Sequence, residues 1–351
     1  MAFSTIIKPS DYFNTKLYTG NFSTNAITGV GFQPDLTWIK SRTTAGEDHY
    51  LFDAIRGVTN YIHSNTTAAQ SSNAATLTTF GSDGFTVGAN NSVNKSSDSL
   101  VAWNWKANGQ GSSNTDGSIN TTYTSANTTS GFSISQYTGT GSNATVGHGL
   151  GVAPKMIIFK NTNTATNWDV FHGSLANTQR LFLDESGAAT TAANAFNSTS
   201  PTTAVFSVGT ADNTNKSSSP MIAYCFADVQ GFSKFGSYTG LGATTGAFVY
   251  TGFKPSFVMT KIATTGGSDT GGWVMVDNKS YPNNLANSPV LFANLNNAQN
   301  DAYNAEFFSN GFSFNANSVT VNGAGNTYSY MAFAETPFVA NSGQSIPTTA
   351  R

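Results

Sequence analysis

The sequence predicts an all-β fold: three tandem β-sandwich repeats of jelly-roll or lectin-like type behind a short N-terminal arm. First, Tyr-Thr-Gly followed by Gly-x-x-Pro occurs three times, ending at Pro34, Pro154 and Pro255, which indicates one unit of roughly 90–100 residues used three times. Second, apolar and polar residues alternate at a period of two, as in half-buried strands. Third, helical periodicity is scarce: only residues 188–196 and 294–304 could hold a turn or two.

The amino-acid composition narrows the classes of molecule that the protein is expected to bind. The 351 residues include 26 Phe, 13 Tyr and 5 Trp, and only 10% are charged, with a net charge of −2. A surface so poor in charge has no electrostatic means of binding phosphate backbones or anionic lipid, so nucleic acid is not an expected partner. No secretory signal opens the chain and no stretch has the roughly 20 apolar residues of a membrane span, so we expect synthesis in a cytoplasm and no membrane insertion.

The chain divides into six segments in order. An N-terminal arm, residues 1–16, offers Ile6, Ile7, Tyr12 and Phe13 as apolar anchors. Repeat 1 covers 17–106, repeat 2 covers 131–228, repeat 3 covers 229–335, and 336–351 form a polar tail. Residues 107–130 are mostly Ser, Thr, Asn and Gly, which predicts a linker or an extended loop. Because no such linker separates repeats 2 and 3, we expect those two to pack more closely together than repeats 1 and 2.

Turn residues mark elements inside the repeats. Each proline is expected just before a strand, because proline cannot donate a hydrogen bond to a sheet. Asp83-Gly84 and Asn310-Gly311, between aromatic runs, predict hairpins with two-residue turns. A small residue between large neighbours recurs in the strand that closes each repeat. If the repeats are equivalent, Ala102, Ala223 and Ala332 occupy the same position.

A search for catalytic, cofactor and metal-binding patterns finds none, so the sequence predicts a protein that is not an enzyme and needs no cofactor. His49, His63, His148 and His172 are scattered without metal-ligand spacing. Gly139-Thr140-Gly141 and Gly240-Leu241-Gly242 lack the third glycine of a dinucleotide fingerprint and are interpreted as turns. The adjacent carboxylates Glu47/Asp48 and Asp184/Glu185 are typical of solvated turns, and Asp98 and Asp116 lack the acidic loop pattern of a Ca²⁺ site.

The aromatic residues and the one cysteine are interpreted mainly as core. Trp103 and Trp105 share one face of a closing strand, as do Tyr224 and Phe226, so they form either core or, less favoured, a sugar-stacking platform. Trp168 and Trp273 occupy similar places in their repeats and are expected to share a core role. Cys225 is predicted to be a buried, inert thiol.

Several phrases resemble a known family. Residues 7–20, 31–40, 51–57, 82–88 and 101–106 are similar to a repeat found in proteins of marine tailed phages that infect cyanobacteria and related bacteria. The resemblance implies a tail-fibre or other virion protein. It is close over repeat 1 and degenerate over repeats 2 and 3, where the Asp53/Arg56 pair has no counterpart. It supplies no catalytic or binding residues.

Two functions follow as expectations. The first is a virion surface protein, a tail fibre or adhesin, whose repeats bind host cell-surface glycan and whose arm attaches it to other virion proteins. The second is a structural virion protein, such as a capsid decoration or a shaft component. Polysaccharide cleavage is disfavoured because no repeat supplies two suitably spaced carboxylates. We also expect a homo-oligomer, with a trimer favoured, since repeats of this size are marginal alone.

Overall fold

Antiparallel strands make up almost all of the regular structure. The computed structural model describes residues 4–264, 271–281 and 287–337. Within them, helix is confined to a 3₁₀ turn, Pro9–Asp11, and two single turns, α1 (Asn91–Asn94) and α2 (Asp212–Asn215). The all-β, sandwich-type prediction is confirmed. Residues 188–196 and 294–304, which could have held a helical turn or two at most, form short strands, turns and loops.

Each repeat contains a main sheet and a smaller sheet. The strands of repeat 1 are β1 (Phe13–Thr19), β2 (Asn25–Thr28), β3 (Leu36–Ser41), β4 (Tyr50–Asp53), β5 (Asn60–Tyr61), β6 (Ser71–Ser72), β7 (Leu77–Gly81), β8 (Gly84–Val87) and β9 (Ser99–Trp105). The main sheet has the order β1-β9-β3-β4, so the closing strand β9 lies between the first strand and the Pro-led strand. The small sheet has the order β2-β8-β7.

Repeat 2 has the same plan. Its strands, with the one that precedes it, are β10 (Tyr123–Asn127), β11 (Phe132–Thr138), β12 (Ala144–Gly147), β13 (Met156–Asn161), β14 (Asp169–His172), β15 (Gln179–Phe182), β16 (Thr190–Thr191), β17 (Val205–Val208) and β18 (Pro220–Phe226). The main sheet runs β10-β11-β18-β13-β14-β15-β16, and β12 pairs with β17. The linker predicted at 107–130 therefore contains a strand, β10, because its backbone completes the edge of the sheet along β11.

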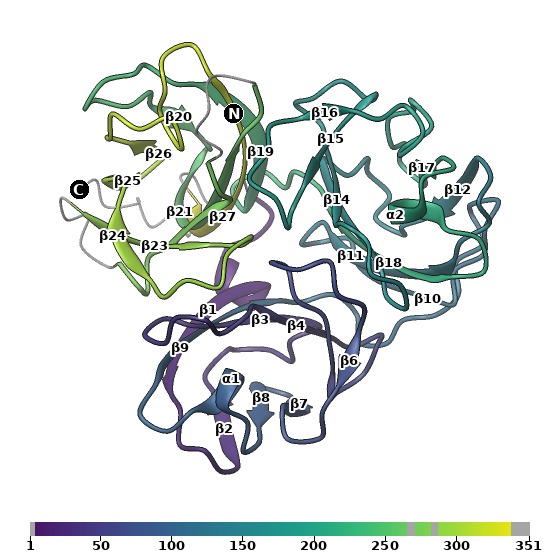
Figure 1. Ribbon diagram of the computed structural model, residues 1–351, viewed down its shortest axis with the longest axis horizontal. Coiled ribbons are helices and arrows are strands. Elements are labelled where there is room, and N and C mark those ends of the chain that lie inside the picture. Colours follow the sequence, from purple (N-terminus) through teal and green to yellow (C-terminus); the bar gives the residue numbers. More distant parts are fainter. Residues whose placement is uncertain (1–3, 265–270, 282–286, 338–351) are drawn as a thin grey trace.

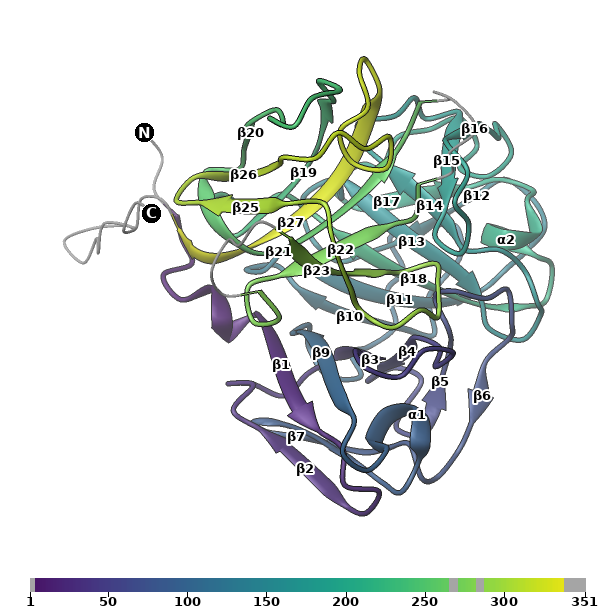
Figure 2. The same cartoon turned by 60° about the vertical axis from the view of Figure 1, so that its left-hand side comes forward.

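Repeat 3 follows the plan a third time. Its strands are β19 (Ser233–Thr239), β20 (Val249–Tyr250), β21 (Phe253–Ile262), β22 (Val274–Asp277), β23 (Ser288–Phe292), β24 (Asn300–Ala302), β25 (Ala305–Phe308), β26 (Gly311–Phe314) and β27 (Thr327–Pro337). The sheets are β19-β27-β21-β22-β23-β24 and β20-β26-β25. Figure 2 shows β25 and β26 lying over β21 and β27 as a second layer, with the core cluster of this repeat between them.

Both predicted hairpins form, but their glycines lie just after the two-residue turn and not within it. The two-residue loops are Ser82-Asp83 and Ser309-Asn310, and the glycines begin the following strands. A Cβ on Gly84 would overlap the carbonyl oxygen of Ile27 on the neighbouring strand, and a Cβ on Gly311 would overlap that of Val249. Glycine is therefore required there by the close approach of a third strand.

Strand register tests the predicted equivalence of positions. In each repeat, the Tyr of Tyr-Thr-Gly pairs with one residue of the closing strand, and the three residues paired in this way occupy equivalent positions. These residues are Leu100, Met221 and Tyr328. The three prolines also correspond, although Pro255 lies inside β21 at a β-bulge while the other two precede their strands. The prediction for Ala332 is wrong: the residue equivalent to Ala102 and Ala223 is Tyr330. Tyr330 fits because it faces Gly236, where a Cβ would lie 3.0 Å from the Tyr330 hydroxyl oxygen.

The main sheets of all three repeats meet at one shared core. Figure 1 shows three lobes around a common centre. The large side chains of this cluster come from every repeat; they include Phe13, Trp38, Trp103, Trp105, Phe132, Tyr224, Phe226, Phe235, Phe257 and Phe333. Each main sheet thus has the shared core on one face and its own sandwich core on the other. For this reason all six residues of β3 and of β13 are buried, where a period of two predicted half-buried strands.

The N-terminal arm is part of this core. Ile6 is buried, and the Phe13 ring stacks on Phe333 of repeat 3 with ring centroids 4.8 Å apart. Ile7, by contrast, is 55% exposed. The regular structure of repeat 1 begins at Phe13, inside the segment assigned to the arm.

Equivalent hydrogen bonds link each repeat to the preceding one and close the chain into a ring. In each bond, a side-chain ring N–H donates to a backbone carbonyl of the neighbouring repeat. The donor residue lies just before the strand that comes next in sequence after the Pro-led strand. The pairs are Trp168 to His63, Trp273 to Phe182 and His49 to Phe292, at 2.9, 2.8 and 3.0 Å. All three interfaces share this bond, and the expectation that repeats 2 and 3 pack more closely than repeats 1 and 2 stays a prediction.

Candidate functional site

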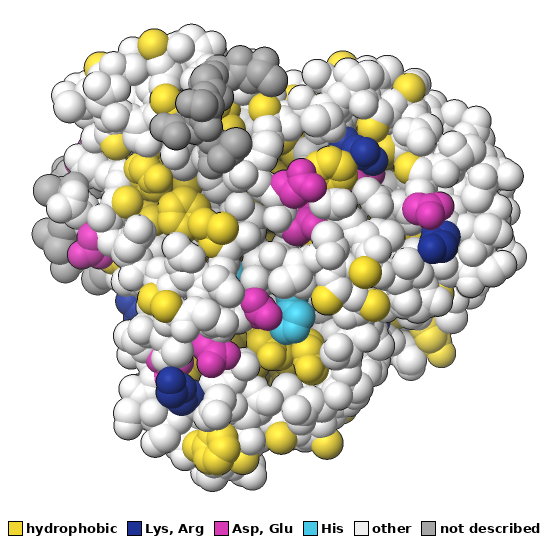
Figure 3. Space-filling view, viewed as in Figure 1, with side chains coloured by type: hydrophobic (Ala, Val, Ile, Leu, Met, Phe, Trp, Pro, Cys, Tyr) yellow, Lys and Arg dark blue, Asp and Glu magenta, His cyan; other side chains and the backbone are white. Residues whose placement is uncertain are grey.

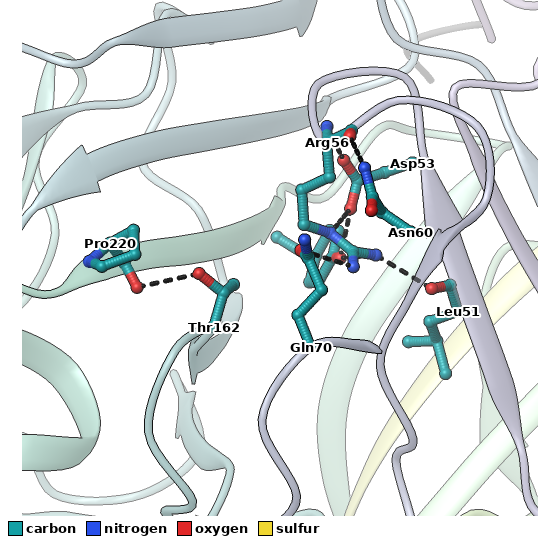
Figure 4. A network of polar contacts seen from close by, with 8 residues as sticks. Leu51, Asp53, Arg56, Asn60, Gln70, Thr162 and Pro220 are labelled. Atoms are coloured by element: carbon teal, nitrogen blue, oxygen red, sulfur yellow. Dashed lines mark hydrogen bonds and ion pairs between the residues drawn. The ribbon is translucent and has the colours of Figure 1, made fainter. Parts of the chain in front are cut away.

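The Asp53/Arg56 pair lies inside the protein, at the interface of repeats 1 and 2 (Figure 4). Arg56 Nε donates to Asp53 Oδ2 at 2.5 Å, and the hydroxyl of Tyr224 from repeat 2 donates to the same oxygen at 2.7 Å. Both charged side chains are at most 1% exposed. Burial lowers the pKa of Arg56, but the Asp53 carboxylate and Tyr224 outweigh this effect and leave the pKa raised. The guanidinium is therefore a permanently charged part of the core.

Asp53 belongs to a set of three equivalent positions, with His172 and Asp277. Each contacts the closing strand of the next repeat: Asp53 through Tyr224, His172 Nε2 at 3.0 Å from the Tyr330 carbonyl oxygen, and Asp277 Oδ2 at 3.2 Å from Trp103 Nε1. Every link is buried and saturated by protein groups. The set joins each repeat to the next.

Three buried lysines form a second equivalent set: Lys40, Lys160 and Lys261. Their ammonium groups donate to backbone carbonyls, including Thr67 of repeat 1 for Lys160 and Ser186 of repeat 2 for Lys261. Burial lowers the pKa of Lys40 and Lys160 to about 8, and that of Lys261 to about 7. The Lys160 and Lys261 side chains thus join neighbouring repeats, whereas Lys40 Nζ donates to the Ser41 carbonyl of its own repeat at 2.9 Å.

The remaining polar candidates are dispersed. His49, His148 and His172 are buried, while His63 is half-buried and packs beside Tyr50 and Tyr61. Burial raises the pKa of Asp184 to about 6, although its Oδ1 accepts from the Trp168 backbone N–H. Within the described residues, no three His, Cys, Asp or Glu side chains gather in a way that could hold a metal ion. No helix in the same residues is long and apolar enough to cross a membrane.

The aromatic residues of the closing strands form the shared core and are not exposed to solvent as a platform. The four side chains Trp103, Trp105, Tyr224 and Phe226 are at most 2% exposed. Trp168 and Trp273 are also buried and have the shared role that their positions predicted. Cys225 is a free, buried thiol whose pKa is raised by burial, as an inert thiol requires.

An exposed aromatic surface lies instead on the small sheet of repeat 3. Phe248, just before β20, is 53% exposed and Tyr250 is 60% exposed, on the face of the strand opposite to buried Val249. The Phe248 ring packs against half-exposed Phe308 of β25 with centroids 5.7 Å apart. We call Phe248, Tyr250 and Phe308 the aromatic platform. Figure 3 shows hydrophobic side chains gathered on this lobe.

Two half-buried polar side chains, Glu306 and Asn315, lie on the same outer side of the small sheet, and the buried Ser313 is bonded to Asn315. Asn315 Nδ2 donates to Glu306 Oε2 at 3.0 Å, and Ser313 Oγ donates to Asn315 Oδ1 at 2.8 Å. Gly311 lies between the strands without a side chain, and a Cβ there would come within 2.9 Å of the Phe248 ring. Aromatic rings beside amide and carboxylate groups can bind a ligand that has both an apolar face and hydroxyl groups.

The platform is a departure from the threefold pattern. By register, the residues equivalent to Phe248 and Tyr250 are Ala26 and Thr28 in repeat 1, and Thr145 and Gly147 in repeat 2. The core residue between them stays apolar in all three repeats: Ile27, Val146 and Val249. Sequence reasoning missed the site. The signal was present, because Phe248-Val249-Tyr250 is the only one of the three segments with an aromatic residue on each side of the core position.

Comparison with known proteins gives one match. Residues 8–337 match a family described as a domain of unknown function, DUF7483. The chain belongs to the DUF7483 family. The DUF7483 match spans all three repeats, in agreement with the closed ring. No curated protein and no solved structure matches the chain.

Proposed function

We propose that this chain is a phage virion surface protein, a tail fibre or adhesin that attaches to host cell-surface glycan. The observation that supports this best is the aromatic platform, with Phe248 and Tyr250 more than half exposed on the small sheet of repeat 3. A pyranose ring has an apolar face for such side chains and hydroxyls that the half-buried Glu306 and Asn315 side chains can bond. The resemblance of repeat 1 to marine phage proteins supports the virion assignment.

The low charge of the surface suits a neutral ligand. Only 10% of residues are charged, and Lys40, Arg56, Lys160 and Lys261 are buried among them. Affinity for a neutral glycan would come from ring stacking and hydrogen bonds, so it should vary little with ionic strength. This distinguishes the proposal from electrostatic adhesion.

A double substitution tests the platform. Phe248→Ala with Tyr250→Thr gives repeat 3 the side chains that repeat 1 already carries at these positions, so the fold should tolerate it. We expect binding to susceptible host cells, and to surface polysaccharide purified from them, to fall by at least about tenfold. The matched control is Leu241→Asn, which replaces another exposed apolar side chain of the same repeat, 56% exposed, by a polar one. This variant should bind like the wild type. Equal binding by all three proteins would contradict the proposal.

The second candidate is a structural virion protein, a capsid decoration or shaft component. The observation that favours it is the same exposed apolar surface, which could pack against another virion protein. Antibody labelling of intact particles separates the two. Copies at the tail tip support the adhesin, and copies spread over the capsid or shaft support the structural role.

A homo-oligomer, with a trimer favoured, remains part of this proposal, together with attachment to other virion proteins. The repeats already bury their inner faces against one another, so any oligomer must use the outer surface. Mass photometry of the purified protein tests this. Monomers alone at working concentration would argue against a preformed oligomer.

A further inference from the structure

Phe22 has an unusual backbone conformation for a bulky residue. It has φ +52° in the turn after Tyr18-Thr19-Gly20, and its side chain is 47% exposed. The left-handed region is unfavourable for side chains with a Cβ and is a clear outlier for an aromatic residue. Within the described residues, no other aromatic ring lies in contact with Phe22, so aromatic packing does not account for its conformation.

The two other repeats show what the fold itself requires here. Gly141 and Gly242 occupy the equivalent position, two residues after the glycine of Tyr-Thr-Gly, with φ +70° and +66°. Glycine adopts this conformation without steric cost. Repeat 1 therefore carries a phenylalanine where the same turn is built more easily with glycine. An exposed aromatic side chain at such a backbone position makes Phe22 a candidate for a functional role.

Several hydrogen bonds hold the turn that presents Phe22. The Phe22 N–H donates to the Asn94 carbonyl oxygen at 2.8 Å, and the Asn94 side chain bonds the Asn21 N–H at 3.0 Å and the Ser23 carbonyl oxygen at 2.6 Å. Ser23 N–H also donates to Asn21 Oδ1 at 2.9 Å. The ring is thus held outward on a fixed loop, which lowers the entropy lost when a ligand binds.

Exposed amide and hydroxyl groups flank the ring. Asn21, Ser23 and Thr24 are all exposed, and no charged residue lies between Asn21 and Thr28. We infer that residues 21–25 form a second glycan-contact site, in which the Phe22 ring lies against the apolar face of a pyranose and the flanking polar groups bond its hydroxyls. This rests on the proposed function for the class of ligand, and it makes one chain bivalent through repeats 1 and 3.

Restoring glycine tests the inference. Phe22→Gly should raise the melting temperature, because backbone strain is relieved, and weaken binding to immobilised host surface polysaccharide by about tenfold through loss of the second contact. Ser198→Gly is the matched control: Ser198 is exposed and has φ +48° in repeat 2. It should raise the melting temperature and leave binding unchanged.

The outcomes separate this inference from the proposed function. If Phe22→Gly is more stable and binds as well as the wild type, while Phe248→Ala/Tyr250→Thr loses binding, the second site is wrong and the platform stands. If the wild type itself does not bind the polysaccharide or susceptible cells, both are wrong. Weaker binding of both variants, with Ser198→Gly unaffected, is the result we expect.

Discussion

His172 is a buried base held in its neutral form. Burial lowers its pKa from 6.5 to about 4, against the opposing effects of its bond to the Tyr330 carbonyl and of the Asp228 carboxylate. Its Nδ1 accepts from the Ser174 N–H at 3.2 Å, which fits an imidazole that donates only through Nε2. Protonation of Nδ1 would break this arrangement at the interface of repeats 2 and 3.

Acid should therefore weaken the fold through His172. Between pH 6.5 and 4 the unfolded chain binds a proton at this residue that the folded chain does not, so stability is lost as pH falls through that window. Relative to His172→Gln, which keeps a side-chain N–H but does not titrate, the wild type should lose about 3 kcal/mol between pH 7 and pH 4. Urea unfolding of both proteins at several pH values measures the difference, and a constant difference would contradict it.

The Asp53–Arg56–Tyr224 contact gives a second prediction for single residues. Asp53→Ala leaves the Arg56 charge buried without its carboxylate and should lower the free energy of unfolding by about 3–5 kcal/mol. Tyr224→Phe removes one hydrogen bond to a charged group and should cost about 1.5–3 kcal/mol. Chemical denaturation distinguishes them. A cost for Asp53→Ala as small as that of a surface substitution would mean that the pair is not buried as described.

Glycine in Tyr-Thr-Gly has a role at the scale of the element. A Cβ on Gly20, Gly139 or Gly240 would overlap the carbonyl oxygen of Lys95, Lys216 or Gly323 in the loop before the closing strand. Gly20→Ala should therefore lower the free energy of unfolding by roughly 1–3 kcal/mol. Gly187→Ala, where nothing lies within 4 Å of the added Cβ, is the control and should change stability by less than about 0.5 kcal/mol. Equal thermal shifts for the two variants would contradict the close approach.

The closing strands offer a matching test in the core. Ala223 is fully buried opposite Phe159 and Ser135, so Ala223→Leu should overpack the site and cost about 1–3 kcal/mol. In repeat 3, Tyr330 fills the equivalent position because Gly236 makes room for it. A thermal melt of Ala223→Leu that matches the wild type would indicate that the strand can shift to accept a larger residue.

The sequence predicted those strands and turns whose signal lies in residues close together in the chain. Turn residues located the hairpins at Ser82-Asp83 and Ser309-Asn310, and the repeated phrase located the Pro-led strands. The register of Ala332 could not be foreseen, because it depends on Gly236 in another strand. β10 was missed for a related reason. Its polar sequence forms a strand only because β11 presents an open edge.

At the scale of the whole molecule, closure of the ring was the largest feature that local patterns did not reveal. The sequence indicated that single repeats are marginal, and an expected source of stability was other subunits of an oligomer. The structure supplies this stability within the chain, through the shared aromatic core and three equivalent interfaces. The exposed positions that break the symmetry, Phe22, Phe248 and Tyr250, become visible only when strand register aligns the repeats.

Cooperative unfolding tests the closed ring most directly. The described tryptophans report on every repeat, since Trp103 lies in repeat 1, Trp168 in repeat 2 and Trp273 in repeat 3. We predict that urea unfolding followed by tryptophan fluorescence and by far-ultraviolet circular dichroism gives one coincident transition, which Asp53→Ala shifts as a whole to lower urea. Two or three separate transitions, with only the first moved by Asp53→Ala, would show that the repeats fold as independent units and would contradict the account.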